Sequence, residues 1–404
     1  MIQKALRLYR EAYAGLSLQI WLLAGVMLIN RAGSMVVPFM TLYFTQELHF
    51  SMQQAGFIIS AYGVGSTIGS LLGGRLTDKL GYFKVQFLGL FLGGFLLFVL
   101  VWMRDFYAVV ACTLVLSMVA DMFRPANSAA VAAFSDVQNR TRAYSLNRLA
   151  INLGFSISPA LGGFLAAQSF SWLFWVDGVT CWIAALILFL FLRNAPETTL
   201  SAEEETETSP QRSAYQDRPF LFFIFLTVCF AIAFMQVFML LPLYLKQQFQ
   251  LPEWYIGLVI SANGLLVALL EMVIVFRVEG YPRKLKIVSR GLLWLVAGYL
   301  LLALNLHYWT AWLFILLITI AEMLAMPFMS TFTIERATVQ NRGQYAALYN
   351  VAYALGYIFA PSFGAYMAST FGFVYLWMAA ATIALFTFGG FRILERWVRH
   401  EKAL

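Results

Sequence analysis

The chain is poor in charge, cysteine and histidine. Charged residues make up only 12% of the 404 residues, whereas hydrophobic residues make up 61%. A soluble domain is typically about a quarter charged, so this composition excludes a water-exposed surface over most of the chain. The three cysteines, Cys112, Cys181 and Cys229, show neither a disulfide framework nor metal-ligand spacing. Without a histidine cluster or a glycine-rich phosphate loop, we predict no enzyme activity, no cofactor and no metal site.

Long apolar runs fill the chain instead. Such runs, of about 20 residues each, suit helices that cross a ~30 Å hydrocarbon core, whereas barrel strands would alternate over short segments. They predict an all-α membrane protein with twelve spans, near 17–44, 53–74, 84–103, 107–132, 143–167, 171–193, 219–245, 254–276, 287–305, 309–333, 344–369 and 371–394. The first run is too long for a signal peptide and no cleavage site follows it, so we interpret it as a span.

Most of the basic residues lie on one side of the predicted membrane topology. If both termini are cytoplasmic, 22 of the 27 Lys and Arg lie on the cytoplasmic side. Two of the others, Arg104 and Lys246, lie outside, and three, Arg31, Arg124 and Arg148, lie within spans. This bias predicts an orientation with both termini inside. It also explains the net charge of +7 without a nucleic-acid partner.

The two halves of the chain repeat one another. Gln138-Asn139-Arg140 recurs as Gln340-Asn341-Arg342, an offset of 202 residues. The same offset relates Pro125 to Pro327, Gly154 to Gly356, Pro159 to Pro361 and Gly162 to Gly364. These ordered matches predict two parallel six-helix bundles, 1–194 and 219–404. Such repeats are typical of transporters, in which the substrate site lies near the membrane midplane between the halves. The acidic segment 195–218 predicts a flexible linker that carries no site.

The segment after the second predicted span carries a distinctive pattern. Gly74-Arg75-Leu76-Thr77-Asp78-Lys79-Leu80-Gly81-Tyr82-Phe83-Lys84 resembles motif A of the major facilitator superfamily. Its glycines permit a tight turn between helices, and Asp78 can face a helix N-terminus or a basic side chain. In the family, the matching Asp biases one access state. Only Lys84 keeps the basic character that the family prefers after Gly81, and the second-half copy around Arg277 is degenerate.

Two other spans resemble further motifs of that superfamily. The segment 152–163 of the fifth span looks like motif C of the drug/proton antiporters, through Gly154, Pro159, Gly162 and Gly163. Ser158 replaces the usual Gly before the proline, and the alternative is a small-residue packing face in which Pro159 bends the helix. Arg124, followed by small residues, resembles motif B, whose Arg the family links to proton transfer. The resemblance covers the whole chain and implies the twelve-span major facilitator fold.

Four ionisable residues are predicted inside the membrane, where charge is costly and usually functional. They are Arg31 in the first span, Asp121 and Arg124 in the fourth and Glu322 in the tenth. By resemblance, spans 1, 4, 7 and 10 line the central cavity. Asp121 and Arg124 are three residues apart, close enough on a helix to pair, and this pair can be structural. Glu322 is predicted to bind a proton or a cationic substrate, and its alternative is a protonated acid bonded to a neighbouring helix.

Uncharged polar residues in the spans are further candidates for the cavity. Asn30, Gln236, Asn263 and Asn350 either contact solute or bridge helices, and Tyr349 and Tyr353 either line the pocket or pack. Asp177 in the sixth span is expected to be peripheral, because by resemblance that helix lies outside the cavity.

Two functions remain open from the sequence. The first is proton-coupled export of amphiphilic small molecules or drugs, in which a proton on Glu322 or Asp121 competes with the substrate. The second is proton-coupled uptake of an anionic or zwitterionic metabolite, peptide or siderophore-like solute, which Arg31 and Arg124 favour. A lipid flippase would share this architecture. We expect a monomer surrounded by the lipids of a bacterial inner membrane.

Overall fold

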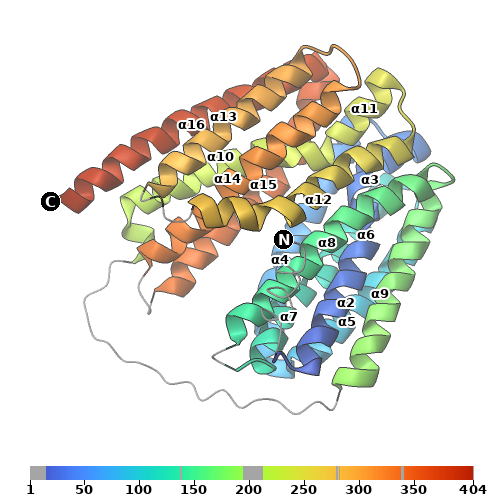
Figure 1. Cartoon of the computed structure of the whole chain (residues 1–404). Helices are drawn as coiled ribbons and strands as arrows, with labels where there is room; N and C mark the ends of the chain where they lie inside the picture. The colour runs from blue at the N-terminus through green and yellow to red at the C-terminus, as the bar shows by residue number, and fades with distance from the viewer. Residues whose placement is uncertain are drawn as a thin grey trace, which may run out of the picture. The chain divides into compact units, whose positions relative to one another are not determined.

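The computed structural model describes residues 15–136, 139–193, 213–278, 281, 283–337 and 341–403, and the regular secondary structure of these residues is helical (Figure 1). Within these ranges, twelve helical stretches are long and apolar enough to cross a membrane. They coincide with the twelve spans that the hydropathy of the sequence predicts. The fold class is therefore the expected all-α membrane fold.

The first six spans comprise helices up to residue 192. Their bounds are α2 (Leu18–Gly33), α3 (Val36–Leu42), a π-helix (Tyr43–Glu47), α4 (Met52–Leu80), α5 (Tyr82–Trp102), α6 (Phe106–Asp121), α7 (Phe123–Ala133), α8 (Arg140–Ala166) and α9 (Phe170–Leu192). The first span breaks at Ser34 and Met35, and the fourth breaks at Met122. Pro38 and Pro125 follow these breaks. Proline has no N–H to donate to the carbonyl four residues earlier, which weakens the helix there.

The last six spans begin at residue 218. Their helices are α10 (Arg218–Met239), α11 (Leu241–Phe249), α12 (Glu253–Val278), α13 (Lys284–Ala303), α14 (Thr310–Arg336), α15 (Arg342–Phe371) and α16 (Phe373–Ala403), and a 3₁₀ turn at Ala214–Gln216 precedes them. The seventh span breaks at Leu240, just before Pro242. Pro327 and Pro361 instead lie inside the continuous helices α14 and α15.

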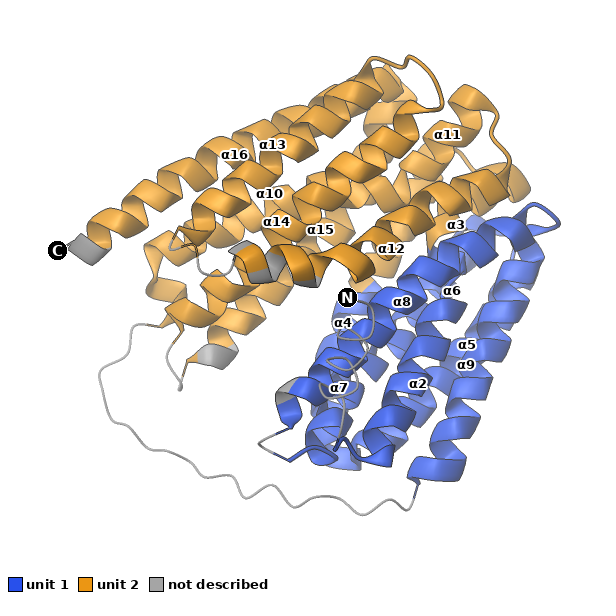
Figure 2. Cartoon of the chain, in the orientation of Figure 1, with its two compact units in different colours: residues 1–37, 65–206 blue, residues 38–64, 207–404 orange. Residues whose placement is uncertain are grey.

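The chain divides into two compact units (Figure 2). One unit comprises residues 1–37 and 65–206, and the other comprises residues 38–64 and 207–404. The end of the first span and the start of the second therefore group with the second half of the sequence. Small residues make this possible, because α4 packs closely on α15 through Gly56 and Gly63. A Cβ atom at Gly56 would overlap Ala365, and one at Gly63 would overlap the backbone of Tyr357.

The packing within each unit reproduces the sequence repeat. In the first unit, α8 packs on α2, and a Cβ atom at Gly154 would overlap Arg31. In the second unit, α15 packs on α10, and a Cβ atom at Gly356 would overlap Ala231. The same glycine thus permits the same helix crossing in each half, as the small-residue interpretation of the fifth span predicts.

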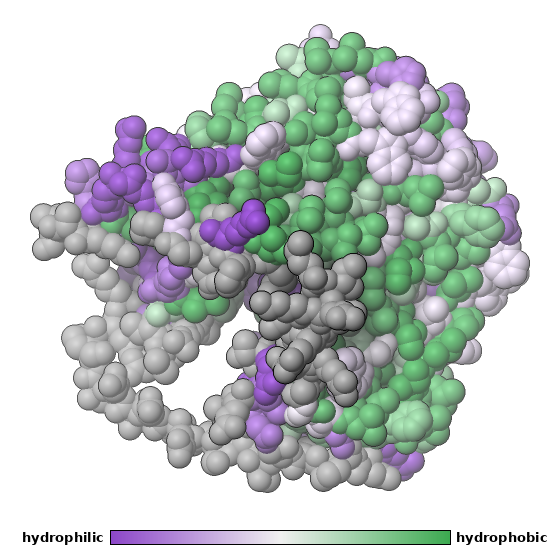
Figure 3. All heavy atoms as spheres, in the orientation of Figure 1, coloured by the Kyte–Doolittle hydropathy of each residue, from purple (hydrophilic) through white to green (hydrophobic). Residues whose placement is uncertain are grey.

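The lateral surface of the helices is apolar. Exposed side chains include Trp21, Phe57, Phe95, Leu186 and Phe386. Hydrophobic residues cover most of the described surface in view, and hydrophilic residues gather near the C-terminal end of α16 (Figure 3). A surface of this kind suits contact with lipid, which fits an integral, multi-pass membrane protein.

Candidate functional site

The second unit holds a buried polar cluster between α12 and α14. Asn263 Nδ2 donates hydrogen bonds to Thr319 Oγ1 and to Glu322 Oε2, each at 2.9 Å. Thr319 Oγ1 in turn donates to the carbonyl of Ile315 at 2.6 Å. Asn263 and Thr319 are buried and Glu322 is half-buried. Thr319 and Glu322 are three residues apart, so both lie on the face of α14 that meets α12. The cluster holds the carboxylate of Glu322 in one orientation.

Two tyrosines of α15 lie close to this cluster. Tyr349 donates a hydrogen bond to the hydroxyl of Tyr353 at 3.4 Å, and their rings meet edge to face with centroids 5.2 Å apart. Tyr353 is near enough to Glu322 to interact with it electrostatically. Four of the residues that the sequence selects, Asn263, Glu322, Tyr349 and Tyr353, are thus brought together from three helices. An acid among hydroxyl and amide groups can exchange a proton or bind a cation.

Two other cavity candidates are placed differently. The side chain of Gln236 is fully buried, and its Nε2 donates to the carbonyl of Ala360 at 2.9 Å and to that of Ile232 at 3.3 Å. Gln236 therefore bridges α10 and α15, which is one of the two roles that the sequence leaves open for it. Asn350 is exposed on α15, next to Tyr349 in the sequence.

The acid and the base of the fourth span form the expected ion pair. Arg124 Nε lies 2.7 Å from Asp121 Oδ1, and Ser66 of α4 donates a hydrogen bond to Asp121 Oδ2. The Asp121 side chain is 5% exposed, whereas that of Arg124 is 48% exposed. The pair lies at the break between α6 and α7, where the absent N–H of Pro125 leaves the carbonyl of Asp121 without its helical donor. It belongs to the first unit, as does Ser66.

The first unit holds a second polar group around the break in the first span. Asn30 Nδ2 lies 3.8 Å from Cys181 Sγ, and Cys181 lies 3.8 Å from Asp177 Oδ1. The backbone of Met35 and of Val36 lies near the Asp177 carboxylate. The guanidinium of Arg31 interacts electrostatically with Asp177 and lies 5.7 Å from the centre of the Phe155 ring.

Asp177 is therefore buried inside its own unit, and its place outside the central cavity stays a prediction. The residue is 6% exposed and lies between α9 and the break that separates α2 from α3. The resemblance places the sixth span as a whole outside the cavity. Within the first unit, the Asp177 carboxylate of this span reaches the neighbouring first span. A lone acid inside an apolar run was the available signal, because such a residue needs a partner.

The motif A segment differs from its predicted conformation. The helix α4 continues to Leu80, so Gly74, Arg75 and Asp78 lie on its last turns and not in a loop. Gly81 alone makes the turn, with φ of +83°, and Lys84 lies in the first turn of α5. The prediction of a glycine turn is correct for Gly81 and wrong for Gly74.

Part of motif C also has a visible role. Gly154 allows the contact between α8 and α2, and Gly162 and Gly163 are buried on the same helix. Pro159 lies inside the continuous helix α8. The segment acts in packing within the first unit.

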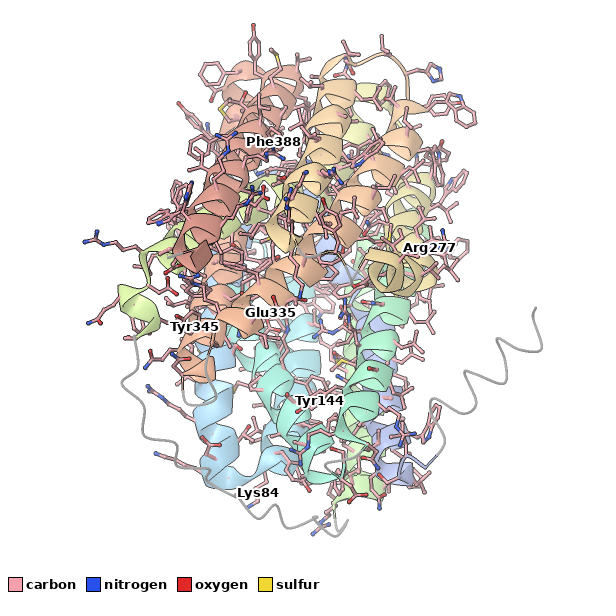
Figure 4. All side chains as sticks on the ribbon, turned by 60° about the vertical axis from the view of Figure 1, so that its left-hand side comes forward. Lys84, Tyr144, Arg277, Glu335, Tyr345 and Phe388 are labelled. Atoms are coloured by element: carbon pink, nitrogen blue, oxygen red, sulfur yellow. The ribbon has the colours of Figure 1, made fainter. Side chains whose placement is uncertain are left out.

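A buried ion pair that the sequence did not reveal joins four segments of the second unit. Arg336 of α14 donates to both oxygens of Asp217, at 2.5 Å and 2.8 Å, and to Glu401 Oε2 at 2.8 Å. The hydroxyl of Tyr345, labelled in Figure 4, donates to Asp217 Oδ2 at 2.8 Å. Asp217 also caps α10 by accepting from the backbone of Phe220 at 3.2 Å. The Asp217-Arg218-Pro219 sequence is a helix-start signal that could have revealed the cap.

This ion pair corrects one feature of the predicted linker. Its glutamates, Glu197, Glu203, Glu204, Glu205 and Glu207, lie outside the described residues. Residues 213–217, however, pack on the second unit, where Ser213 and the backbone of Ala214 bond to the side chain of Gln344. Burial raises the pKa of Asp217, but hydrogen bonds from Arg336 and Tyr345 outweigh it, so the pKa lies below its usual range.

Comparison with known proteins gives relatives along most of the chain. A Na(+), Li(+), K(+)/H(+) antiporter of Planococcus maritimus is 28% identical, covering 88% of this chain and 94% of the relative. The uncharacterized MFS-type transporter YttB of Bacillus subtilis is 26% identical, covering 93% and 95%. The quinolone resistance protein NorA of Staphylococcus aureus is 23% identical, covering 70% and 73%.

Solved structures share the fold. A POT family transporter in complex with 5-aminolevulinic acid has a TM-score of 0.78 at 14% identity, covering 94% of this chain and 96% of that one. A bacterial homolog of the human lysosomal transporter Spinster also has a TM-score of 0.78, at 12% identity, with the same coverage. The family model of the Major Facilitator Superfamily matches residues 21–360 and 255–402. This chain, with its twelve spans, its internal repeat and its motif A, belongs to the Major Facilitator Superfamily.

Proposed function

We propose that this transporter is a proton-coupled antiporter that exports cationic amphiphilic small molecules, with Glu322 as the carboxyl that proton and substrate share. The observation that carries the proposal is the bond from Asn263 Nδ2 to Glu322 Oε2, beside Thr319 and Tyr353. Glu322 is half-buried and accepts a hydrogen bond from a neutral amide. Its carboxylate attracts either a proton or an organic cation.

The coupled exchange of proton and cation follows from the free-energy cost of an ionised carboxylate inside the membrane. An ionised carboxylate inside the membrane is expensive, so the state in which Glu322 binds neither ligand is disfavoured during the conformational change. Proton and cation cannot occupy the same oxygen together, so one must leave before the other binds. Inward movement of the proton then drives outward movement of the cation. The phenol rings of Tyr349 and Tyr353 supply faces on which an organic cation can lie.

The two relatives with named activities support this class of reaction. One is named as an antiporter and the other as a quinolone resistance protein. The uptake of an anionic solute receives less support, because the basic residues that suggested it face acids. Arg124 pairs with Asp121, and Arg31 interacts with Asp177.

The polar cluster also favours a second candidate, exchange of an alkali cation for protons. The nitrogen and oxygen of an Asn amide are assigned from their hydrogen bonds. If the Asn263 amide rotates by half a turn, its oxygen joins Thr319 Oγ1 and Glu322 Oε2 in facing one point. Hard cations bind such oxygen groups, and the Planococcus relative is named for Na(+), Li(+) and K(+).

The proposed orientation places both termini in the cytoplasm of a bacterial inner membrane. It rests on the sorting of Lys and Arg, 22 of 27 of which fall on one side of the predicted topology. In that orientation, exported substrate leaves through the face opposite the linker.

Proteoliposomes test the proposal. With an acidic lumen and a luminal pH dye, ethidium or tetraphenylphosphonium is added outside in one arm, and Na⁺, Li⁺ or K⁺ in the other. We expect added substrate to release luminal protons for the wild type and for the control variant Glu335→Gln. Glu335 lies at the C-terminal end of α14, the helix that carries Glu322, and pairs with Lys284. Glu322→Gln should abolish the release. Proton release that survives in Glu322→Gln overturns the role of Glu322, and a response to metal cations alone selects the second candidate.

A further inference from the structure

The start of α13 and the end of α16 lie at one end of the second unit. Lys284, the first residue of α13, pairs with Glu335 near the end of α14. The next residue of α14, Arg336, donates to Glu401 Oε2 of α16 at 2.8 Å. Because consecutive residues of α14 bind both neighbours, the ends of these three helices lie together. From there α13 and α16 pack side by side along the unit (Figure 1).

The outward faces of both helices are apolar along their length and basic at this end. On α16, the side chains of Ile393 and Trp397 are exposed. Arg396 is exposed three residues after Ile393, so it lies on the same face. On α13, Arg290 is exposed four residues before the exposed Trp294, so it also shares the outward face of its helix. The space-filling view shows hydrophilic residues gathered near the end of α16 (Figure 3).

The carboxylates at this end already have basic partners. Three ion pairs use them, and these are Lys284–Glu335, Arg336–Glu401 and Arg399–Glu395. Within the part of the chain that the structure describes, no carboxylate forms an ion pair with Arg290, Arg392 or Arg396. Arg392 is half-buried, four residues before Arg396, and therefore lies beside it on α16. Three guanidinium groups are thus available to an anion from outside the protein.

We propose that Arg290, Arg392 and Arg396 together bind the headgroup of an anionic phospholipid. The planar guanidinium group of arginine matches the oxygens of a phosphate group. The anion belongs to a lipid because the arginines continue the apolar faces of α13 and α16, along which acyl chains lie. Trp397 is of the residue type that favours the level of the headgroups, and long arginine side chains extend to that level from within a span. The surface does not depend on the cargo or on Glu322.

Native mass spectrometry of the full-length protein in detergent measures the binding of single lipid molecules. The probes are phosphatidylglycerol, which is anionic, and phosphatidylcholine with the same acyl chains, which has no net charge. We expect the wild type to bind its first phosphatidylglycerol roughly tenfold or more tightly than phosphatidylcholine. The combined variant Arg290→Gln, Arg392→Gln and Arg396→Gln should lose this preference, because each basic residue near the headgroups attracts anionic lipid. Equal affinity of the wild type for the two lipids would overturn the proposal.

A charge-preserving variant separates binding from damage to the fold. The combination Arg290→Lys, Arg392→Lys and Arg396→Lys keeps all three positive charges and should retain the preference to within about threefold. Loss of the preference in this variant as well would show that charge is not its cause and would count against the proposal. The melting temperature of each variant confirms that folded protein is compared.

A second variant controls for net charge. The combination Arg142→Gln, Arg193→Gln and Arg277→Gln removes three charges from exposed side chains near the ends of α8, α9 and α12. We expect it to keep the preference for phosphatidylglycerol to within about twofold. An equal loss in this control, or a preference that survives without the arginines at positions 290, 392 and 396, would refute a specific surface on α13 and α16. Glu322→Gln should bind both lipids as the wild type does, so failure of the Glu322 proposal remains distinguishable.

Discussion

Asn263 Nδ2 lies 2.9 Å from both Thr319 Oγ1 and Glu322 Oε2, so one amide of α12 holds two residues on a single face of α14. The arrangement gives the candidate acid a fixed direction without a formal positive charge in the bond. Because the bond to the carboxylate is charge-assisted, it should matter more than the bond to the hydroxyl. This difference makes the cluster testable by single substitutions.

Loss of the amide should impair exchange more than loss of the hydroxyl. We expect Asn263→Leu to lower proton-coupled flux roughly tenfold, because a hydrogen bond to a charged group is removed from the Glu322 carboxylate. Thr319→Val keeps that bond and should retain at least about half of the flux. Flux in proteoliposomes, normalised to folded protein, measures both. Equal effects of the two substitutions would contradict the assigned role of the amide.

The contact between α8 and α2 should tolerate no side chain at Gly154. An added Cβ atom would overlap Arg31 and the backbone of Ala32, so Gly154→Ala should destabilise the protein by about 1–3 kcal/mol. Gly25→Ala on α2 is the matched control, because a Cβ atom there has no neighbour within 4 Å. It should be neutral or stabilising, by up to about 1 kcal/mol. Thermal unfolding in detergent distinguishes the two, and similar melting temperatures for both variants would refute the packing argument.

The two glycines of motif A should respond oppositely to alanine. Gly81 has φ of +83°, so Gly81→Ala should cost about 1–2 kcal/mol of stability. Gly74 lies within α4 with open space around a Cβ atom, so Gly74→Ala should stabilise the helix by about 0.5–1 kcal/mol. Melting temperatures in detergent compare the pair. A larger loss at Gly74 would show that the end of α4 is not helical there.

The ion pair at Asp217 should stabilise the second unit in a pH-dependent way. Because the pKa of Asp217 is lower in the folded state, its contribution is fully present above the unfolded-state pKa and is lost as the pH falls through the folded-state pKa. Asp217→Asn leaves Arg336 without its buried carboxylate partner and should lower stability near neutral pH by about 3 kcal/mol.

A pH series of melting temperatures checks the sign. The difference between wild type and Asp217→Asn should be constant from neutral pH down to about pH 4 and shrink below it. Glu395→Gln removes an exposed pair with Arg399 on α16 and serves as the control, with an expected effect near zero. A difference that grows on acidification would contradict the lowered pKa of Asp217.

Several features of the fold were predictable because they depend on local composition. Runs of apolar residues set the number of spans. The offset of 202 residues related Gly154 to Gly356, which permit matching helix contacts. Helical spacing placed Asp121 beside Arg124, which form an ion pair of 2.7 Å. In each of these cases the partners are close in the chain or the signal is summed over many residues.

Contacts between distant segments could not be predicted in the same way. Gln236 is an amide in a span, as Asn263 is, yet Gln236 bonds to the backbone of Ala360 and Asn263 bonds to an acid. The difference depends on which helix faces each amide, and hydropathy carries no information about this. Residues 38–64 belong to the same compact unit as the second half of the chain. This grouping likewise depends on the close fit of α4 against α15.

The sequence by itself determined a twelve-span, two-fold repeated membrane protein with a few ionisable residues inside its spans. In lipid, each span must form its own backbone hydrogen bonds and must bury or pair its charged side chains. These properties can therefore be predicted from composition and spacing. Only the tertiary structure decided which partner each buried group has. Asn263 binds Glu322, and Asp217 binds Arg336, across 59 and 119 residues respectively. Such bonds are made by helix packing, which brings together groups that the linear order keeps apart.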